Sequence, residues 1–158
     1  MTPAKLGKFI LTFVLIGGAI MSFVLDWSRN HLLNPLWHPH ARYHSAILLF
    51  VFAGEAGVGT WLLWRKSKEP AVAFAAASLL SLSYWTPFFY VPFFLPMSSY
   101  WAGIPGNEPR LGGHIIYPNL VVVALFALLS VAGWALGNSM YVAHDPMPAA
   151  VADGSSGC

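Results

Sequence analysis

Ionisable side chains crowd into one short stretch of this chain. Four histidines, one aspartate, two arginines and one glutamate lie between residues 26 and 55, although only 9% of all residues are charged. They are Asp26, Arg29, His31, His38, His40, Arg42, His44 and Glu55. Polar groups are costly to remove from water, so a cluster of them in an apolar chain indicates a functional site.

Two of these histidines and the glutamate fall on one face of a predicted helix. His40 and His44 are four residues apart, and Glu55 follows His44 by eleven residues, which at roughly 100° per residue returns to nearly the same face. Glu55 lies near the middle of an apolar segment, where inserting an acidic residue costs roughly 2.5 to 3.5 kcal/mol. We therefore expect Glu55 to be protonated or paired inside the protein. The alternative is a neutral Glu55 that hydrogen-bonds a neighbouring helix for packing alone.

The expected topology gathers further polar residues at one membrane face. The end of the first apolar segment, the connection after it, the start of the second segment and the start of the fourth all lie there. This face is expected to hold Asp26, His31, His38, His40, Arg42, His44, Arg110 and His114, and His144 lies on the opposite side.

General acid–base catalysis is the chemistry that this set favours. Histidine titrates near neutral pH and exchanges protons with carboxylates whose surroundings differ. We predict an integral membrane enzyme that needs no cofactor and isomerises, cyclises or hydrates a lipophilic small molecule such as a sterol, an isoprenoid or a polyketide. The predicted catalytic residues are Asp26, His40, His44, Glu55 and His114. The predicted substrate-binding residues are Asn34, Trp37, Arg42, Trp85, Tyr90 and Arg110.

Metal binding is the first alternative. Histidines four residues apart on a helix, with others nearby, are typical ligands of zinc, copper or iron. The residues nominated for a metal-dependent membrane oxidoreductase are His31, His40, His44 and His114.

A role without catalysis is the second alternative. The protein would then be a subunit of a larger membrane complex, or a carrier in which Glu55 takes up a proton. Glycine-bearing helix faces favour association into a homo-oligomer or a larger complex under each of these readings.

Four long apolar segments must position these residues. With 57% hydrophobic residues, the chain lacks the polar side chains that cover a water-soluble protein, so membrane lipids are its expected surroundings. Each segment has roughly the 20 apolar residues that a membrane-spanning helix needs. The prediction is an all-α, polytopic four-helix transmembrane domain over residues 1–137, with spans at about 6–25, 46–64, 71–95 and 117–136, and a disordered cytoplasmic tail over 138–158.

Prolines indicate where these helices begin and bend. Pro39 and Pro118 suit helix starts. Pro87 and Pro92 should bend the third span, with Thr86 or a neighbour compensating for lost backbone hydrogen bonds.

Charge sets the expected orientation. Five basic residues lie on one side (Lys5, Lys8, Arg65, Lys66 and Lys68) and three on the other (Arg29, Arg42 and Arg110), which predicts that both termini are cytoplasmic. The net charge of +2, without a broad basic face, argues against a nucleic-acid partner. The first apolar run has no cleavage site after it, so we expect it to be retained.

The stretch around the first histidines resembles a known signature. Asp26, His31, Asn34-Pro35, Trp37 and the run Pro39 to His44 are similar to the pattern D-x4-H-x2-NP-x-W-x-PHAR-aromatic-H of small, uncharacterised four-helix membrane proteins. A histidine and a glutamate on one helix beneath aromatic residues is also similar to the emopamil-binding sterol isomerase group. In that group the two residues are separated by about one turn. The second resemblance implies acid–base chemistry on a lipophilic molecule.

Overall fold

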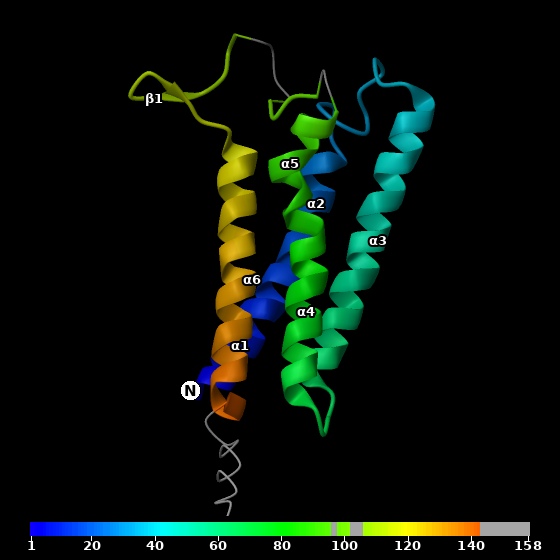
Figure 1. The fold of residues 1–158 in the computed structure, drawn as a ribbon. Helices are drawn as coiled ribbons and strands as arrows, with labels where there is room; N and C mark the ends of the chain where they lie inside the picture. Colours follow the sequence, from blue (N-terminus) through cyan, green and yellow to red (C-terminus); the bar gives the residue numbers. More distant parts are fainter. Residues whose placement is uncertain (96–97, 102–105, 143–158) are drawn as a thin grey trace, which may run out of the picture.

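The protein is helical and long enough in four places to cross a membrane. The computed structural model describes residues 1–95, 98–101 and 106–142. Membrane-length apolar helices occupy Pro3–Asp26, Pro39–Trp64, Pro70–Phe94 and Pro118–Ser139 (Figure 1). The prediction of an all-α, four-helix membrane protein is confirmed. The expected tail and His144 fall mostly beyond residue 142, outside the described residues.

The first span consists of three consecutive helical pieces. These are α1 (Pro3–Thr12), a π-helical turn at Phe13–Gly17 and α2 (Gly18–Asp26). The Thr2 hydroxyl accepts a hydrogen bond from the Lys5 amide, which caps the start of α1. The span ends at Asp26, where the chain turns into the first connection.

The second span is one uninterrupted helix, α3 (Pro39–Trp64). It begins at Pro39, as the sequence predicts, because proline suits the first helical turn. The His38 ring accepts a hydrogen bond from the His40 amide and so caps the helix. The residues that α3 buries are spaced three or four apart: Leu49, Phe52, Ala56, Gly59 and Leu63.

The third span is broken near its end. It consists of α4 (Pro70–Trp85) and α5 (Pro87–Phe94), with Pro92 inside α5. Pro87 has no amide hydrogen, so it leaves the carbonyl of Ser83 without its helical donor. The Thr86 hydroxyl donates to the Leu82 carbonyl at 2.8 Å, but that carbonyl also accepts from the Thr86 amide, so this bond does not replace the donor that Ser83 loses.

A small hairpin precedes the fourth span. Strands β1 (Arg110–Leu111) and β2 (His114–Ile115) pair antiparallel around Gly112 and Gly113, whose φ angles of 57° and 85° suit glycine. Helix α6 (Pro118–Val142) begins at Pro118 as expected and continues past Gly137, where the sequence analysis placed the start of the tail.

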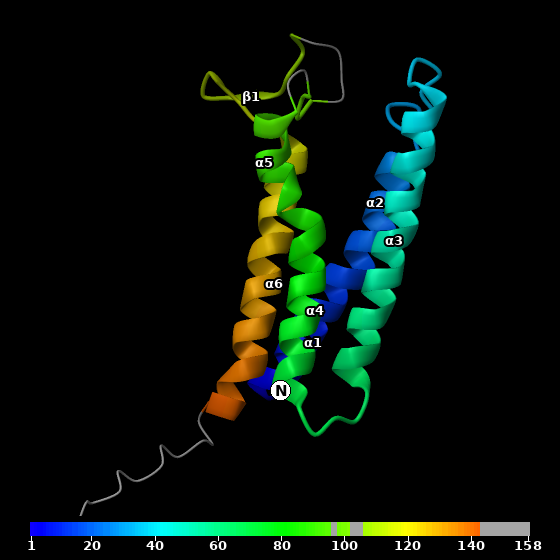
Figure 2. The same cartoon turned by 45° about the vertical axis from the view of Figure 1, so that its right-hand side comes forward.

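The first span crosses the bundle diagonally. Figure 2 shows α1 beside the lower part of α6, whereas α2 lies beside α3. Glycines allow the close approach of α1 and α6, because a Cβ on Gly7 would lie 2.5 Å from the Gly133 carbonyl oxygen. Gly137 leaves room for the ring of Phe74 in the same way.

This tilt divides the molecule into a tight half and a hollow half. We call the end with the N-terminus and the α3–α4 connection the terminal end, and the opposite end the loop end (Figure 1). At the terminal end, the Trp64 indole donates to the Thr12 hydroxyl at 2.9 Å. Midway, buried Ser81 and Ser130 join α4 to α6 through a 2.8 Å hydrogen bond. Towards the loop end, α2 and α3 diverge from α5 and α6 (Figure 2).

Candidate functional site

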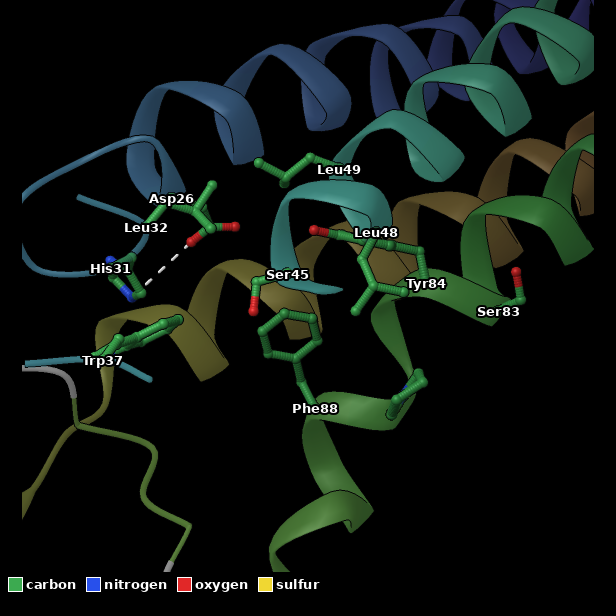
Figure 3. Close-up of a pocket in the computed structure, with 11 residues that line it drawn as sticks. Asp26, His31, Leu32, Trp37, Ser45, Leu48, Leu49, Ser83, Tyr84 and Phe88 are labelled. Atoms are coloured by element: carbon green, nitrogen blue, oxygen red, sulfur yellow. Dashed lines mark ion pairs between the residues drawn. The ribbon is translucent and has the colours of Figure 1, made fainter. Parts of the chain in front are cut away.

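The last residue of the first span pairs with a histidine of the connection that follows it. His31 Nε2 lies 3.9 Å from Asp26 Oδ1, which makes an ion pair when the imidazole is protonated (Figure 3). The other ring nitrogen, Nδ1, lies 3.4 Å from the Ser28 hydroxyl. Both side chains of the pair are about one-third exposed, so they contact the protein and remain accessible to a ligand.

The first connection holds His31 in this position by its own hydrogen bonds. The Leu32 amide donates to the Asp26 carbonyl at 3.0 Å, and the His31 amide donates to the Ser28 carbonyl at 3.1 Å. The edge of the Trp37 ring packs near the His31 ring, with 6.1 Å between centroids. The distance between Asp26 and His31 is therefore set by a closed turn.

Two further contacts fix the connection to the bundle. Leu32 is buried, and its carbonyl accepts a 2.6 Å hydrogen bond from Arg42 Nε on α3. Within the connection, the Asn34 side chain accepts a hydrogen bond from the Leu36 amide at 2.9 Å. This bond tightens the turn that contains Pro35, just before Trp37. Arg42 and Asn34 therefore hold the connection in place, and neither lines the space around Asp26.

Tyr84 of α4 completes the polar group. Its phenol lies near the side chain of buried Ser22 and near Asp26. Figure 3 shows the Tyr84 hydroxyl directed towards Asp26. The Tyr84 ring is stacked on Phe52 of α3, with centroids 3.6 Å apart, so this hydroxyl is held firmly.

Three apolar hollows meet at this polar group. The α3-side hollow, of about 370 Å³, lies between α2, α3 and the α4–α5 break (Figure 3). Besides Asp26 and His31, it is lined by Leu32, Trp37, Ser45, Leu48, Leu49, Ser83, Tyr84, Pro87 and Phe88. Ser83, whose carbonyl receives no hydrogen bond from Pro87, is one of these lining residues.

The second hollow lies on the opposite side of Tyr84 and Phe88. This α6-side hollow, of about 550 Å³, runs between α2, α4 and α6. Its apolar wall is formed by Met21, Val24, Leu25, Trp85, Phe88, Val122 and Val123. Its polar lining residues include Ser22, Asn30 and Asn119 around Asp26 and His31.

The third hollow leads towards the loop end. This upper hollow, of about 340 Å³, follows α5 from Pro87 to Pro92 and reaches Ser98, Ser99, Tyr100 and Asn119. Asp26, His31 and Phe88 line all three hollows. A molecule in any of them would contact the Asp26–His31 pair.

Two lining residues lie below the ends of their helices. Ser45, which lines the α3-side hollow, is six residues into α3, and Phe88 is six residues before α5 ends at Phe94. At 1.5 Å per residue, each is about 9 Å along its helix axis from that helix end. Asp26 itself is the last residue of its span, so the hollows extend from the end of the first span down to this depth.

Several predicted site residues are elsewhere. His40 and His44 contact each other, with 3.0 Å between their Nε2 atoms, but both are exposed in the first turns of α3. His114 and Arg110 are exposed on the hairpin, and exposed Tyr90 packs against Phe94 on α5. Of the residues nominated for catalysis or substrate binding, only Asp26, Trp37 and Trp85 line the three hollows.

Glu55 does not join Asp26 either. It lies beside the buried stripe of α3, partly exposed, and lines none of the three hollows. Within the part of the chain that the structure describes, its carboxyl forms no hydrogen bond or ion pair. Ser45 faces the site instead, because it precedes Leu49 and Phe52 by four and seven residues on the buried stripe.

Sequence reasoning missed several residues of the site. Ser22, Ser45, Tyr84 and Phe88 were not nominated, and His31 was nominated only as a metal ligand. A usable signal existed for Ser45 and Ser22, since each is a small polar residue at helical spacing from buried apolar ones. The turn that brings His31 back to Asp26 has no comparable periodic signal.

The histidines nominated as metal ligands lie in three separate places. Among residues 1–95, 98–101 and 106–142, no three or more histidine, cysteine, aspartate or glutamate side chains lie close enough together to hold a metal ion. His31 is apart from the His40–His44 pair, and His114 is on the hairpin.

Residues 10–146 match a family described as "Family of unknown function (DUF6640)". The chain belongs to this family. The match covers most of the first span, the other three spans and the whole candidate site, and four apolar helices make its member here a small membrane protein. No curated protein and no solved structure matches the chain.

Proposed function

We propose that this DUF6640 member is an integral membrane enzyme that performs acid–base chemistry on a lipophilic small molecule at Asp26 and His31. The observation that supports this most is the Asp26–His31 pair at the junction of three apolar hollows. Relative to the sequence prediction, the chemistry is the same and the residues differ. Asp26 is retained, and His31 replaces His40, His44, Glu55 and His114.

The pair is suited to moving one proton. His31 Nε2 lies 3.9 Å from Asp26 Oδ1, and the Ser28 hydroxyl lies beside the other ring nitrogen, so the imidazole would exchange a proton with a substrate next to the carboxylate. In an isomerisation, the pair would take a proton from one carbon of an unsaturated substrate and return a proton to another, with no net change in composition. The Tyr84 hydroxyl would donate a hydrogen bond to a substrate oxygen near Asp26.

Isomerisation, cyclisation and hydration remain the proposed reaction types. The apolar walls favour a substrate that is mostly hydrocarbon, with few polar atoms. The similarity to the emopamil-binding sterol isomerase group supports the kind of chemistry proposed. It does not support the residues assigned here, because it is carried by His44 and Glu55, which line none of the three hollows.

The test compares lipids before and after incubation with purified protein. The protein in lipid nanodiscs is incubated with a total lipid extract, and products are separated by chromatography and mass spectrometry. An isomerase or cyclase yields a product of unchanged mass and altered retention, and a hydratase yields one that is heavier by one water. Asp26→Asn and His31→Gln should each reduce conversion by about 10² to 10⁴-fold, the usual contribution of a general acid or base.

Two sets of variants make the result decisive. Glu69→Gln neutralises an exposed carboxylate in the α3–α4 connection and should leave conversion unchanged. If Glu55→Gln and His44→Ala abolish conversion while Asp26→Asn does not, the catalytic centre is the stripe on α3 and the present assignment is wrong.

One contact favours a second candidate, metal binding at the start of α3. The 3.0 Å separation of His40 and His44 Nε2 suits two ligands of one transition-metal ion. Elemental analysis of purified protein would then find zinc, copper or iron in near-stoichiometric amount, and His40→Ala would remove it.

A role as a subunit instead predicts a larger membrane partner that co-purifies with a chain that converts no lipid.

A further inference from the structure

We propose that the molecule handled at Asp26–His31 is a membrane-resident amphiphile that enters sideways from the bilayer, through two openings on opposite sides of the α4–α5 helix. This inference rests on the proposed function and names its substrate class: a small polar head on an apolar body. It also separates the route of the substrate from the route of water.

The α3-side hollow reaches below the helix ends. Ser45 and Phe88, which line it, are each about 9 Å along the helix axis from the loop-end tip of their helix, at a rise of 1.5 Å per residue. The first connection covers the Asp26–His31 pair on the α3 side, where buried Leu32 and the Trp37 ring line this hollow. A molecule that arrived from water would have to pass these apolar groups before reaching Asp26.

Exposed apolar side chains form the rims of the α3-side and α6-side hollows. Leu48, at the rim of the α3-side hollow, is 61% exposed on the outer surface of the bundle. Val24 and Leu25, at the rim of the α6-side hollow, are 69% and 55% exposed. These side chains belong to membrane-length helices, so what they face is lipid. Both hollows therefore open towards the bilayer.

Polar and apolar side chains are separated within the two lateral hollows. Tyr84 and Phe88 separate the two lateral hollows, and Asp26 and His31 are reached from both. Leucine, valine, methionine and aromatic side chains line the parts away from the pair, whereas the polar groups gather beside it. An amphiphile fits this pattern with its head at Asp26 and its body in either hollow.

The upper hollow suits water. Its lining includes Ser98, Ser99, Tyr100 and Asn119 in addition to the pair, and it leads along α5 towards the loop end. Water in this hollow would exchange protons with the imidazole and would supply the molecule that a hydration consumes. The fold thus gives the pair a polar path for protons and two apolar openings for the substrate.

Cysteine accessibility tests the route without knowledge of the substrate. The chain has one cysteine, Cys158, so Cys158→Ser provides a background for single cysteines. Ser45→Cys reports on the α3-side hollow and Val122→Cys on the α6-side hollow. Each is treated in liposomes with a lipid-soluble pyrene maleimide and with a membrane-impermeant sulfonated maleimide. Leu36→Cys, at a position 90% exposed in the first connection, is the reference for water access.

Both hollow cysteines should react with the pyrene reagent about tenfold faster than with the sulfonated one, because charged groups are excluded from hydrocarbon. Leu36→Cys should react readily with the sulfonated reagent. Ser81→Cys is fully buried between α4 and α6 and should react with neither.

Rim substitutions test each opening separately. Leu48→Trp should slow pyrene labelling of Ser45→Cys but not of Val122→Cys, and Leu25→Trp should do the reverse. The matched control is Leu79→Trp, which is 65% exposed on α4 and lines none of the three hollows. It should change neither rate.

The outcomes that overturn the inference are distinct from those that overturn the proposed function. If the sulfonated reagent labels both hollow cysteines as fast as it labels Leu36→Cys, or if neither hollow cysteine reacts, lateral entry is wrong. Maleimide labelling measures access to the hollows, whereas lipid conversion measures chemistry at Asp26–His31. If labelling shows lateral access but no lipid is converted, the proposed enzyme activity is wrong and the hollows are a binding site for an amphiphile.

Discussion

Arg42 is a charged residue that contributes to the site without lining it. The sequence suggests a substrate-binding role, whereas the structure uses its Nε to hold the Leu32 carbonyl, one residue after His31. A hydrogen bond from a charged donor contributes about 1.5 to 3 kcal/mol. The guanidinium therefore acts on Asp26 through the position of the first connection.

We expect Arg42→Ala to loosen this connection while the bundle stays folded. Amide hydrogen exchange of residues 28–37 should accelerate by about tenfold or more, as loss of roughly 1.5 kcal/mol implies. Exchange in α6 should not change. His40→Ala is the matched control, because His40 lies in the same first turns of α3 but contacts His44 instead. Equal protection in the Arg42→Ala protein would show that Leu32 burial alone holds the connection.

At the scale of the helices, glycines differ in how closely a neighbouring helix approaches them. A Cβ on Gly7 would be 2.5 Å from the Gly133 carbonyl oxygen, which is backbone and cannot move aside. A Cβ on Gly54 would meet nothing within 4 Å. These two glycines thus form a matched pair of positions on two spans.

Gly7→Ala should destabilise the protein by about 1 to 3 kcal/mol, the usual cost of overpacking. Gly54→Ala should be neutral or slightly stabilising, because alanine favours helix over glycine. Unfolding in mixed micelles, followed by circular dichroism as denaturing detergent is added, measures both. If the two variants unfolded alike, the α1–α6 contact would not hold the first span at its tilt.

The elements were more predictable from sequence than their mutual arrangement. Pro39, Pro118 and the Thr86-Pro87 break act locally, so their effects could be predicted from short-range sequence. The stripe of His40, His44 and Glu55 also exists, because α3 is one continuous helix. Which flank of α3 faces the interior depends on contacts with α2 and α4, and sequence periodicity does not specify those contacts.

The site itself was harder to predict for a related reason. Asp26 was nominated because the expected topology gathers it with the histidines at one membrane face, but its partner His31 is brought back by a turn with two prolines nearby. Tyr84 reaches the pair from a span that is more than fifty residues away in sequence. Such contacts depend on the diagonal first span, which in turn depends on Gly7, Gly133 and Gly137.

For the whole molecule, the four spans put both ends of the helical domain on one side of the membrane. Lys5, Lys8, Arg65, Lys66 and Lys68 lie at the terminal end, and Arg29, Arg42 and Arg110 at the loop end. Basic residues favour the cytoplasmic side. We therefore propose that the terminal end is cytoplasmic and that the openings beside Asp26 lie in the opposite leaflet.

Labelling of intact cells, or of sealed vesicles of known orientation, checks this orientation. An impermeant maleimide should reach Leu36→Cys from the exoplasmic side and should reach native Cys158 only after the membrane is permeabilised. The opposite pattern would reverse the molecule. The site would then draw its substrate from the cytoplasmic leaflet.

The diagonal first span also has a mechanical consequence. It is packed closely as far as Gly18, where a Cβ would lie 2.7 Å from the Trp85 ring, and it carries Asp26 eight residues further on, roughly 12 Å away at 1.5 Å per residue. A bend of about 5° in this outer part would displace Asp26 by roughly 1 Å. Asp26 is thus held at the end of a short arm on a fixed base.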